Sequence, residues 1–247
     1  MTNTERTSAL ITGANKGLGL EAARRLGALG WTIFLGSRDE GRGQAAAARL
    51  AEDGIDVTMI PLDVTSDASV SEAVRLVREH TDHLDVLINN AGAPGNVVPP
   101  ADATAGEIHA VYDTNVYGPV RVTHAFLPLL QAAEHPRVVM VSSGGGSFAV
   151  VTDPDQPISK MHELAYSSSK AALNMITVRY AQALPHIKFN VATPGETANR
   201  RFAATDMNHH TGLLTVTEGT DSIVELATLG PDGPTGVFVD RLGPIAW

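Results

Sequence analysis

Seven short runs of apolar residues recur along the chain, and most of them are continuously apolar rather than alternating with polar residues. Continuous runs are typical of parallel strands that are buried on both faces of a sheet. The pattern therefore predicts a buried parallel sheet. Its expected strands cover residues 8–12, 32–37, 57–64, 84–90, 137–143, 187–194 and 235–240.

The segments between these runs have the spacing of amphipathic helices. The expected helices cover residues 18–30, 41–54, 67–80, 104–133 and 166–184. Strands that alternate with helices predict a parallel sheet with right-handed crossovers. Because no linker or internal repeat interrupts the alternation, we expect a single α/β domain over residues 1–247. This domain would be a doubly wound (Rossmann) fold of about seven parallel strands, with helices on both faces.

Two irregular stretches, residues 144–165 and 196–215, break this alternation. Both follow the carboxyl ends of expected strands. Ligands of open α/β sheets bind at that end of the strands. We therefore expect these stretches to form the substrate loops, with surface decoration as the alternative.

The composition restricts the possible partners. The chain has a formal net charge of −9, which argues against a nucleic-acid partner or an anionic membrane. An anionic ligand would therefore need a local cluster of cations. The absence of cysteine excludes disulfides, thiolate metal sites and a cysteine nucleophile. No signal peptide is recognisable and no run approaches the ~18 apolar residues of a membrane span, so we expect a cytoplasmic protein.

A glycine-rich loop, "TGANKGLG" at residues 12–19, directly follows the first expected strand. Gly13, Gly17 and Gly19 would let the backbone turn sharply and approach a pyrophosphate at the N-terminus of the next helix. The spacing matches neither G-x-G-x-x-G nor G-x-x-x-x-G-K-[ST]. Taken alone, the loop is also compatible with a plain tight turn.

The end of the second strand indicates which dinucleotide would bind. NAD-binding proteins usually place an acid there, which accepts hydrogen bonds from the adenosine ribose. Here the strand ends in Ser37 and is followed by Arg38, while Lys16 lies in the nearby loop. Two cations suit a 2′-phosphate and hence NADP(H). The alternatives are that the two cations are solvated surface residues, or that the cofactor is NAD. Asp39 would either point outward or pair with Arg38.

A second motif, "YSSSK" at residues 166–170, opens a helical segment. Residues four apart share one face of a helix, so Lys170 would lie near the Tyr166 hydroxyl. A nearby positive charge stabilises a phenolate and would lower the Tyr166 pKa from its usual ~10 toward the range useful for proton transfer. By itself, Y-x-x-x-K is usually a surface pair.

The two motifs occur in a longer ordered set. "TGANKGLG", "NNAG" (89–92), "NVYG" (115–118), "VSS" (141–143), "YSSSK" and "PG" (194–195) follow one another along essentially the whole chain. In this order they resemble the short-chain dehydrogenase/reductase family. Lys16 and the segments 37–46, 62–65 and 226–247 are most similar to the NADP-linked carbonyl reductases of that family.

The resemblance implies a role for each matching residue. Tyr166 would be the acid/base, Lys170 would lower its pKa and bind the nicotinamide ribose, and Ser143 would bind the substrate oxygen. Asn115 would hold a water that links Lys170 to bulk solvent. Two hydroxyl donors directed at a carbonyl that accepts hydride would lower the barrier. The implied cofactor contacts are Gly13, Asn15, Lys16, Gly17, Leu18, Gly19, Arg38, Asp63, Val64, Asn90, Tyr166, Lys170, Pro194, Gly195 and Thr197.

The chain departs from the family pattern in two places. Twenty-two residues separate Ser143 from Tyr166, more than in much of the family, and we expect the extra length to form part of the substrate mouth. Some carbonyl reductases have a longer insertion at this place, and in them it accompanies a monomeric state. Because the insertion here is shorter, the oligomeric state is left open between a monomer, a homodimer and a homotetramer. Asn199 stands where the family usually has a threonine, so the partner of the nicotinamide amide is not assigned. Ser142 remains an alternative to Ser143.

We therefore expect an NADP(H)-dependent oxidoreductase that reduces an aldehyde or ketone, or oxidises the alcohol, and acts on a small molecule. The alternative is a non-catalytic protein that senses NADP(H), although a sensor has no need of an acid/base set. We expect no metal site, because "HELAY" (162–166) begins like H-E-x-x-H but ends in Tyr166.

Overall fold

The computed structural model describes residues 6–96, 98–196, 201–205 and 211–247. Eight strands form one sheet in the order β10-β9-β6-β5-β4-β1-β2-β3. Neighbouring strands are parallel except β10, which pairs antiparallel with β9 at the edge. The doubly wound fold of seven parallel strands is thus confirmed, with one antiparallel strand added. The strands are β1 Ser8–Ile11, β2 Thr32–Ser37, β3 Val57–Pro61, β4 Val86–Asn89, β5 Arg137–Val141, β6 Lys188–Ala192, β9 Phe238–Asp240 and β10 Gly243–Pro244.

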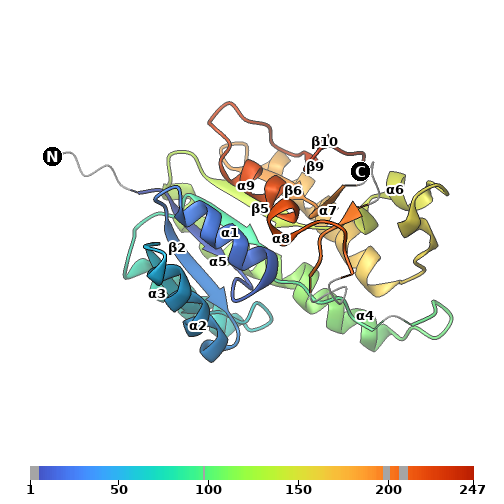
Figure 1. Cartoon of the computed structure of the whole chain (residues 1–247), viewed down its shortest axis with the longest axis horizontal. Helices are drawn as coiled ribbons and strands as arrows, with labels where there is room; N and C mark the ends of the chain where they lie inside the picture. Colours follow the sequence, from blue (N-terminus) through green and yellow to red (C-terminus); the bar gives the residue numbers. More distant parts are fainter. Residues whose placement is uncertain (1–5, 97, 197–200, 206–210) are drawn as a thin grey trace.

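Helices cover both faces of this sheet (Figure 1). One buried core contains residues of α3, α5 and α7, and the other contains residues of α1, α2 and α9. Because successive side chains of a strand point to opposite faces, Leu10 belongs to the first core, whereas Ala9 and Ile11 belong to the second. The helices are α1 Gly17–Gly27, α2 Glu40–Glu52, α3 Asp67–Arg78, α4 Ala105–Tyr112, α5 Gly118–Ala132, α6 Phe148–Thr152, α7 Ala165–Ala183, α8 Val216–Gly219 and α9 Asp221–Ala227.

The segment expected as one helix over residues 104–133 is interrupted. A π-helical turn, Asp113–Tyr117, lies between α4 and α5. The Gly118 amide donates to the carbonyl of Asp113, five residues earlier. Pro119 follows and has no amide hydrogen to continue the regular ladder. Such turns are frequent at functional sites, and this one contains Asn115.

The two irregular stretches contain short elements of their own. In the first, α6 lies between two 3₁₀ turns, Gly144–Gly146 and Pro157–Lys160. It packs near the chain end, since the Ala149 amide donates to the Trp247 carbonyl at 3.1 Å. In the second, β7 Gly195–Glu196 and β8 Arg201–Phe202 form a small antiparallel ribbon.

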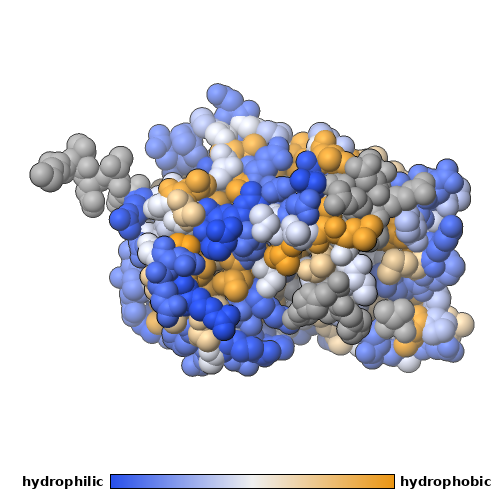
Figure 2. Space-filling view, viewed as in Figure 1, coloured by the Kyte–Doolittle hydropathy of each residue, from blue (hydrophilic) through white to orange (hydrophobic). Residues whose placement is uncertain are grey.

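Apolar surface lies close to the second stretch. Figure 2 shows hydrophobic surface around the position that α8 occupies in Figure 1. Leu213, shortly before α8, is 73% exposed, whereas its neighbour Leu214 is buried. Within the described residues, no helix has the length and apolar character needed to cross a membrane.

Candidate active site

The candidate site lies at the carboxyl ends of four neighbouring strands. β6, β5, β4 and β1 are adjacent in the sheet, and the strand order reverses between β1 and β4. Four of the six predicted motifs lie at the ends of these strands: the glycine-rich loop follows β1, "NNAG" spans the end of β4, "VSS" spans the end of β5, and "PG" follows β6. Motifs that are far apart in sequence therefore meet at one edge, where doubly wound sheets bind ligands.

Tyr166 and Lys170 occupy the first turns of α7. The Lys170 side chain is 4% exposed, and its amino nitrogen donates to the Val141 carbonyl at 2.9 Å. The same nitrogen lies 5.6 Å from the centre of the Tyr166 ring. Burial lowers the pKa of Lys170 to about 8. The structure thus brings these two residues together as the spacing predicts.

The pKa of Tyr166 differs from the sequence-based expectation. It is raised to about 12, first because burial disfavours the phenolate. A hydrogen bond with the Ser143 side chain lowers it, and the nearby Glu163 carboxylate raises it further. The expectation of a lowered Tyr166 pKa is therefore wrong for this structure, in which burial decides the direction of the shift. The buried Lys170 amine is directed to the Val141 carbonyl instead.

Of the two adjacent serines, Ser143 faces Tyr166. The Ser143 hydroxyl is hydrogen-bonded to Tyr166 and accepts from the Gly145 amide at 3.1 Å. Ser142 is only 2% exposed, and its hydroxyl donates a long hydrogen bond of 3.5 Å to the Lys170 carbonyl. The contacts therefore favour Ser143 over its neighbour.

Asn115 is fully buried in the π turn beside Lys170. Its Oδ1 accepts from the Ala93 amide at 2.8 Å, and its Nδ2 donates to the Ala93 carbonyl and to the Ser169 hydroxyl. A Cβ placed on Gly92 would lie 3.5 Å from Asn115 Oδ1 and 3.7 Å from Lys170 Nζ. Both distances are ordinary van der Waals contacts, so the chain at Gly92 passes close to both side chains.

Sequence reasoning missed Ser169. Its hydroxyl donates to the Tyr166 carbonyl at 2.6 Å and accepts from Asn115 Nδ2 at 3.0 Å. Ser169 is fully buried and ties the π turn to the first turn of α7. The only available signal was its position in "YSSSK", where the other serines have the same chemistry.

The glycine-rich loop has a backbone that suits an anion. Gly13 and Gly17 have φ values of +63° and +56°, which side chains rarely tolerate. A Cβ on Gly19 would lie 2.5 Å from Asn90 Nδ2 and 2.8 Å from the Gly13 carbonyl. Helix α1 begins here, and no side chain caps its N-terminus. The free amides of its first turn can therefore receive a phosphate.

Asn90 and Thr12 fix the shape of this loop. The side-chain nitrogen Nδ2 of Asn90 donates to the carbonyls of Thr12 and Gly13 at 2.8 and 3.2 Å. The Thr12 hydroxyl accepts from the backbone amides of Asn90 and Ala91. The structure thus places Asn90 underneath the loop as a support. Thr12 was missed as a site residue, although it opens the motif.

The cations expected near a 2′-phosphate are both exposed. Lys16 lies at the start of α1 and Arg38 directly follows β2. Asp39 accepts from the Arg42 amide at 2.8 Å and forms an ion pair with the Arg42 guanidinium at 2.9 Å. It therefore caps α2 and pairs with Arg42. Of the two alternatives for Asp39, pairing with Arg38 is not realised.

The remaining expected cofactor contacts also surround this edge. The Asp63 carboxylate accepts from the amide and hydroxyl of Thr65, and Val64 is buried. The Pro194 carbonyl accepts from the Ala203 amide at 3.1 Å, while the Gly195 backbone pairs within the small ribbon. Asn15 and Leu18 lie in the loop, half-buried. Thr197 and Asn199 fall outside the described residues.

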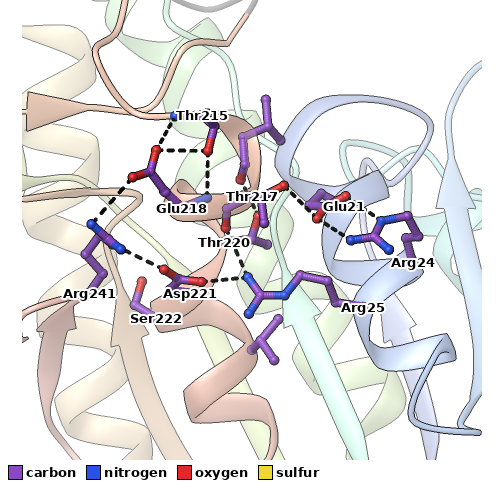
Figure 3. A network of polar contacts seen from close by, with 12 residues as sticks. Glu21, Arg24, Arg25, Thr215, Thr217, Glu218, Thr220, Asp221, Ser222 and Arg241 are labelled. Carbon is purple, nitrogen blue, oxygen red and sulfur yellow. Dashed lines mark hydrogen bonds and ion pairs between the residues drawn. The ribbon is translucent and has the colours of Figure 1, made fainter.

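Polar contacts connect α8 and α9, which follow the second irregular stretch, to α1 (Figure 3). Arg25 of α1 donates to the Thr217 carbonyl at 3.0 Å and to Asp221 Oδ1 at 2.8 Å. Arg241 donates to the other Asp221 oxygen at 3.1 Å. The chain that leaves the stretch is thus held against the helix that begins at the glycine-rich loop.

Comparison with known proteins agrees with this geometry. The model of the short chain dehydrogenase family matches residues 7–210. The (+)-neomenthol dehydrogenase of Capsicum annuum is 31% identical, over 94% of this chain and 95% of that protein. The (−)-isopiperitenone reductase of Mentha piperita is 32% identical, over 94% and 96%. The structure of an NADPH-bound carbonyl reductase from chicken fatty liver is 29% identical, with a TM-score of 0.83, and the match covers 98% of this chain and 100% of that one.

Proposed function

Because the chain belongs to the short chain dehydrogenase family, we propose that it is an NADP(H)-dependent carbonyl reductase. It would reduce an aldehyde or ketone to an alcohol, or run in reverse. One observation carries the proposal: the Ser143 and Tyr166 hydroxyls are hydrogen-bonded beside the buried Lys170 amine, at the carboxyl ends of central strands. A neomenthol dehydrogenase, an isopiperitenone reductase and a carbonyl reductase among the relatives support the same chemistry.

The two hydroxyls suit the reduction of a carbonyl. When bound, NADPH supplies the hydride. Negative charge then grows on the substrate oxygen, and the Ser143 and Tyr166 hydroxyls would stabilise it by donating hydrogen bonds. The Tyr166 pKa of about 12 keeps its phenol protonated at neutral pH. Tyr166 therefore holds the proton that the oxygen takes up during reduction.

Lys170 and Asn115 would support Tyr166. Once Tyr166 has given up its proton, the Lys170 ammonium, 5.6 Å from the ring centre, favours the phenolate. With its pKa near 8, Lys170 is still mainly protonated at neutral pH. The Asn115 side chain is occupied by Ala93 and Ser169, so we assign it the task of holding the π turn against α7.

The cofactor assignment depends on the glycine-rich loop and two cations. The uncapped first turn of α1 and the glycines at positive φ fit a pyrophosphate. Lys16 and Arg38 fit a 2′-phosphate, because Asp39 is engaged with Arg42. An acid that would accept the ribose hydroxyls of NAD is not placed at the tip of β2.

A Tyr166→Phe variant tests the assignment. Loss of the phenol proton should reduce turnover by at least about 10²-fold, while the affinity for NADPH stays the same. Tyr180→Phe is the matched control, because Tyr180 lies on the same helix but stacks on Phe189 at 5.0 Å. Turnover is measured as loss of NADPH absorbance with a panel of aldehydes, ketones and quinones. Retained turnover in Tyr166→Phe would exclude the mechanism.

The same assay separates the enzyme from the sensor. A non-catalytic NADP(H) sensor would bind NADPH tightly and consume it with no carbonyl compound. The hydrogen-bonded pair of Ser143 and Tyr166 favours the enzyme, because binding the cofactor alone requires neither a proton donor nor a second hydroxyl.

A further inference from the structure

A carboxyl group near Tyr166 has no cationic partner within the part of the chain that the structure describes. Glu163 comes three residues before Tyr166, just ahead of α7, and its side chain is half-buried. Its Oε1 accepts a long hydrogen bond of 3.5 Å from the Ser167 hydroxyl. No cation among the described residues forms an ion pair with it, and burial raises its pKa. The reaction derived above has no use for this group.

Neighbouring polar side chains connect Glu163 to the Ser143 and Tyr166 hydroxyls. A Cβ on Gly145 would lie 3.1 Å from the Ser167 hydroxyl and 3.5 Å from the Ser143 hydroxyl. The two serines therefore flank the same glycine, and Glu163 is joined to them through its contact with Ser167. Its negative charge also acts on the Tyr166 phenol. Glu163 is thus linked through Ser167 and Gly145 to the hydroxyls at which a carbonyl would bind.

A half-buried carboxylate that pairs with no cation of the described residues loses part of its hydration, and a cationic ligand would offset that cost. The surrounding charges favour a cationic ligand. The irregular stretch that contains Glu163 also carries Asp153 and Asp155 but only one lysine, Lys160, and the whole chain has a net charge of −9. Such a field raises the local concentration of cations at the mouth.

We propose that Glu163 is a specificity-determining residue that selects carbonyl substrates bearing a positively charged amino group. The inference rests on the proposed carbonyl reductase function. A purely structural role gives a different expectation: a carboxylate at the start of α7, which lacks a side-chain cap, would stabilise that helix and leave substrate choice unchanged.

Two ketones of the same shape test the proposal. The N,N-dimethyl-4-oxopiperidinium ion carries a permanent charge, and 4,4-dimethylcyclohexanone replaces its nitrogen by carbon. We expect the wild-type protein with NADPH to prefer the cation on the order of tenfold in kcat/KM. In Glu163→Gln, which keeps the shape and removes the charge, this preference should vanish through a higher KM for the cation only. Asp155→Asn, an exposed carboxyl of the same stretch, should keep the preference.

The outcomes distinguish this proposal from the function it rests on. A wild type that reduces both ketones equally, or a preference that survives in Glu163→Gln, overturns the role of Glu163 but leaves the carbonyl reductase standing. An equal loss for both ketones together with a lower melting temperature assigns Glu163 to helix stability instead. If neither ketone is reduced, calorimetry of the oxopiperidinium ion with wild type and Glu163→Gln decides: weaker binding to the variant supports the proposal, and equal binding overturns it.

Discussion

Lys170, which we propose supports Tyr166, is a buried cation, and no acid is among the causes that shift its pKa. Burial alone lowers the Lys170 pKa from 10.5 to about 8. The unfolded chain therefore binds a proton more tightly than the folded one at this position, so folding is disfavoured while Lys170 is charged. This cost is complete below pH 8 and decreases as the pH rises toward 10.5. The amine that we propose serves the reaction thus makes the fold less stable at neutral pH.

We predict that the stability gap between Lys170→Met and wild type depends on pH. At pH 7 the variant escapes the burial cost, and by pH 10 the wild type should have regained up to about 3 kcal/mol relative to it. Urea unfolding at both pH values measures the gap. Lys160→Met, at an exposed lysine, is the control and should show no such change. A gap that is the same at pH 7 and pH 10 would contradict the burial of the charge.

The sequence motifs predict which residues form the candidate site, but they do not predict what those residues contact. The ordered motifs suffice to select Tyr166 and Lys170, and the structure brings the two together. They do not distinguish Ser143 from Ser142, because adjacent residues leaving a strand face opposite sides and the side depends on the exact strand end. The sequence also does not predict the direction of the Tyr166 pKa shift, because the shift depends on burial in the packed structure.

At the scale of elements, the regular pattern is predictable and its interruptions are less so. The continuous apolar runs mark all seven parallel strands, because burial on both faces leaves a clear signal. The π turn at Asp113–Tyr117 produces no break in helical periodicity, although Gly118 and Pro119 indicate a change of hydrogen bonding. The short helix α6 is held by contacts with the distant chain end, which no local pattern records.

The link between α1 and α9 predicts a measurable effect on stability. Arg25→Met keeps the aliphatic stem but removes the hydrogen bonds to the Thr217 carbonyl and Asp221. The Asp221 carboxylate would keep only its contact with Arg241. Because both side chains of the lost pair are partly buried, we expect a loss of about 1–2 kcal/mol in the free energy of unfolding.

Arg24→Met is the matched control on the same helix. Among the described residues, Arg24 pairs with Glu21 alone, one turn earlier, and its side chain is 46% exposed. A pair of this kind contributes within about 0.5 kcal/mol. Chemical denaturation of both variants compares them directly. Equal losses would show that the contacts with α8 and α9 add nothing beyond a surface ion pair.

At the scale of the whole molecule, global and local charge oppose each other. The chain carries a net charge of −9, which repels an anionic dinucleotide. The fold compensates at one place, where the uncapped start of α1, Lys16 and Arg38 come to the same edge of the sheet. Binding of NADPH should therefore depend on a few residues at this edge, and high salt should weaken it.

We predict that NADPH stabilises the protein far more than NADH does. A ligand at 100 times its dissociation constant adds about 2.7 kcal/mol, which raises the melting temperature of a chain of this size by roughly 5–10 °C. Arg38→Ala should remove most of the difference between NADPH and NADH by weakening the affinity for NADPH at least about tenfold. Thermal shift with each cofactor gives the comparison.

Arg42→Ala supplies the control, because Arg42 is an exposed arginine nearby that pairs with Asp39. It removes the same charge from the chain and leaves Arg38 in place. The NADPH shift should persist in this variant, since the 2′-phosphate would contact Arg38 directly. If Arg38→Ala and Arg42→Ala weaken NADPH binding equally, the effect is one of net charge, and the assignment of Arg38 to the 2′-phosphate is wrong. Equal stabilisation of the wild type by NADH and NADPH would favour an NAD enzyme instead.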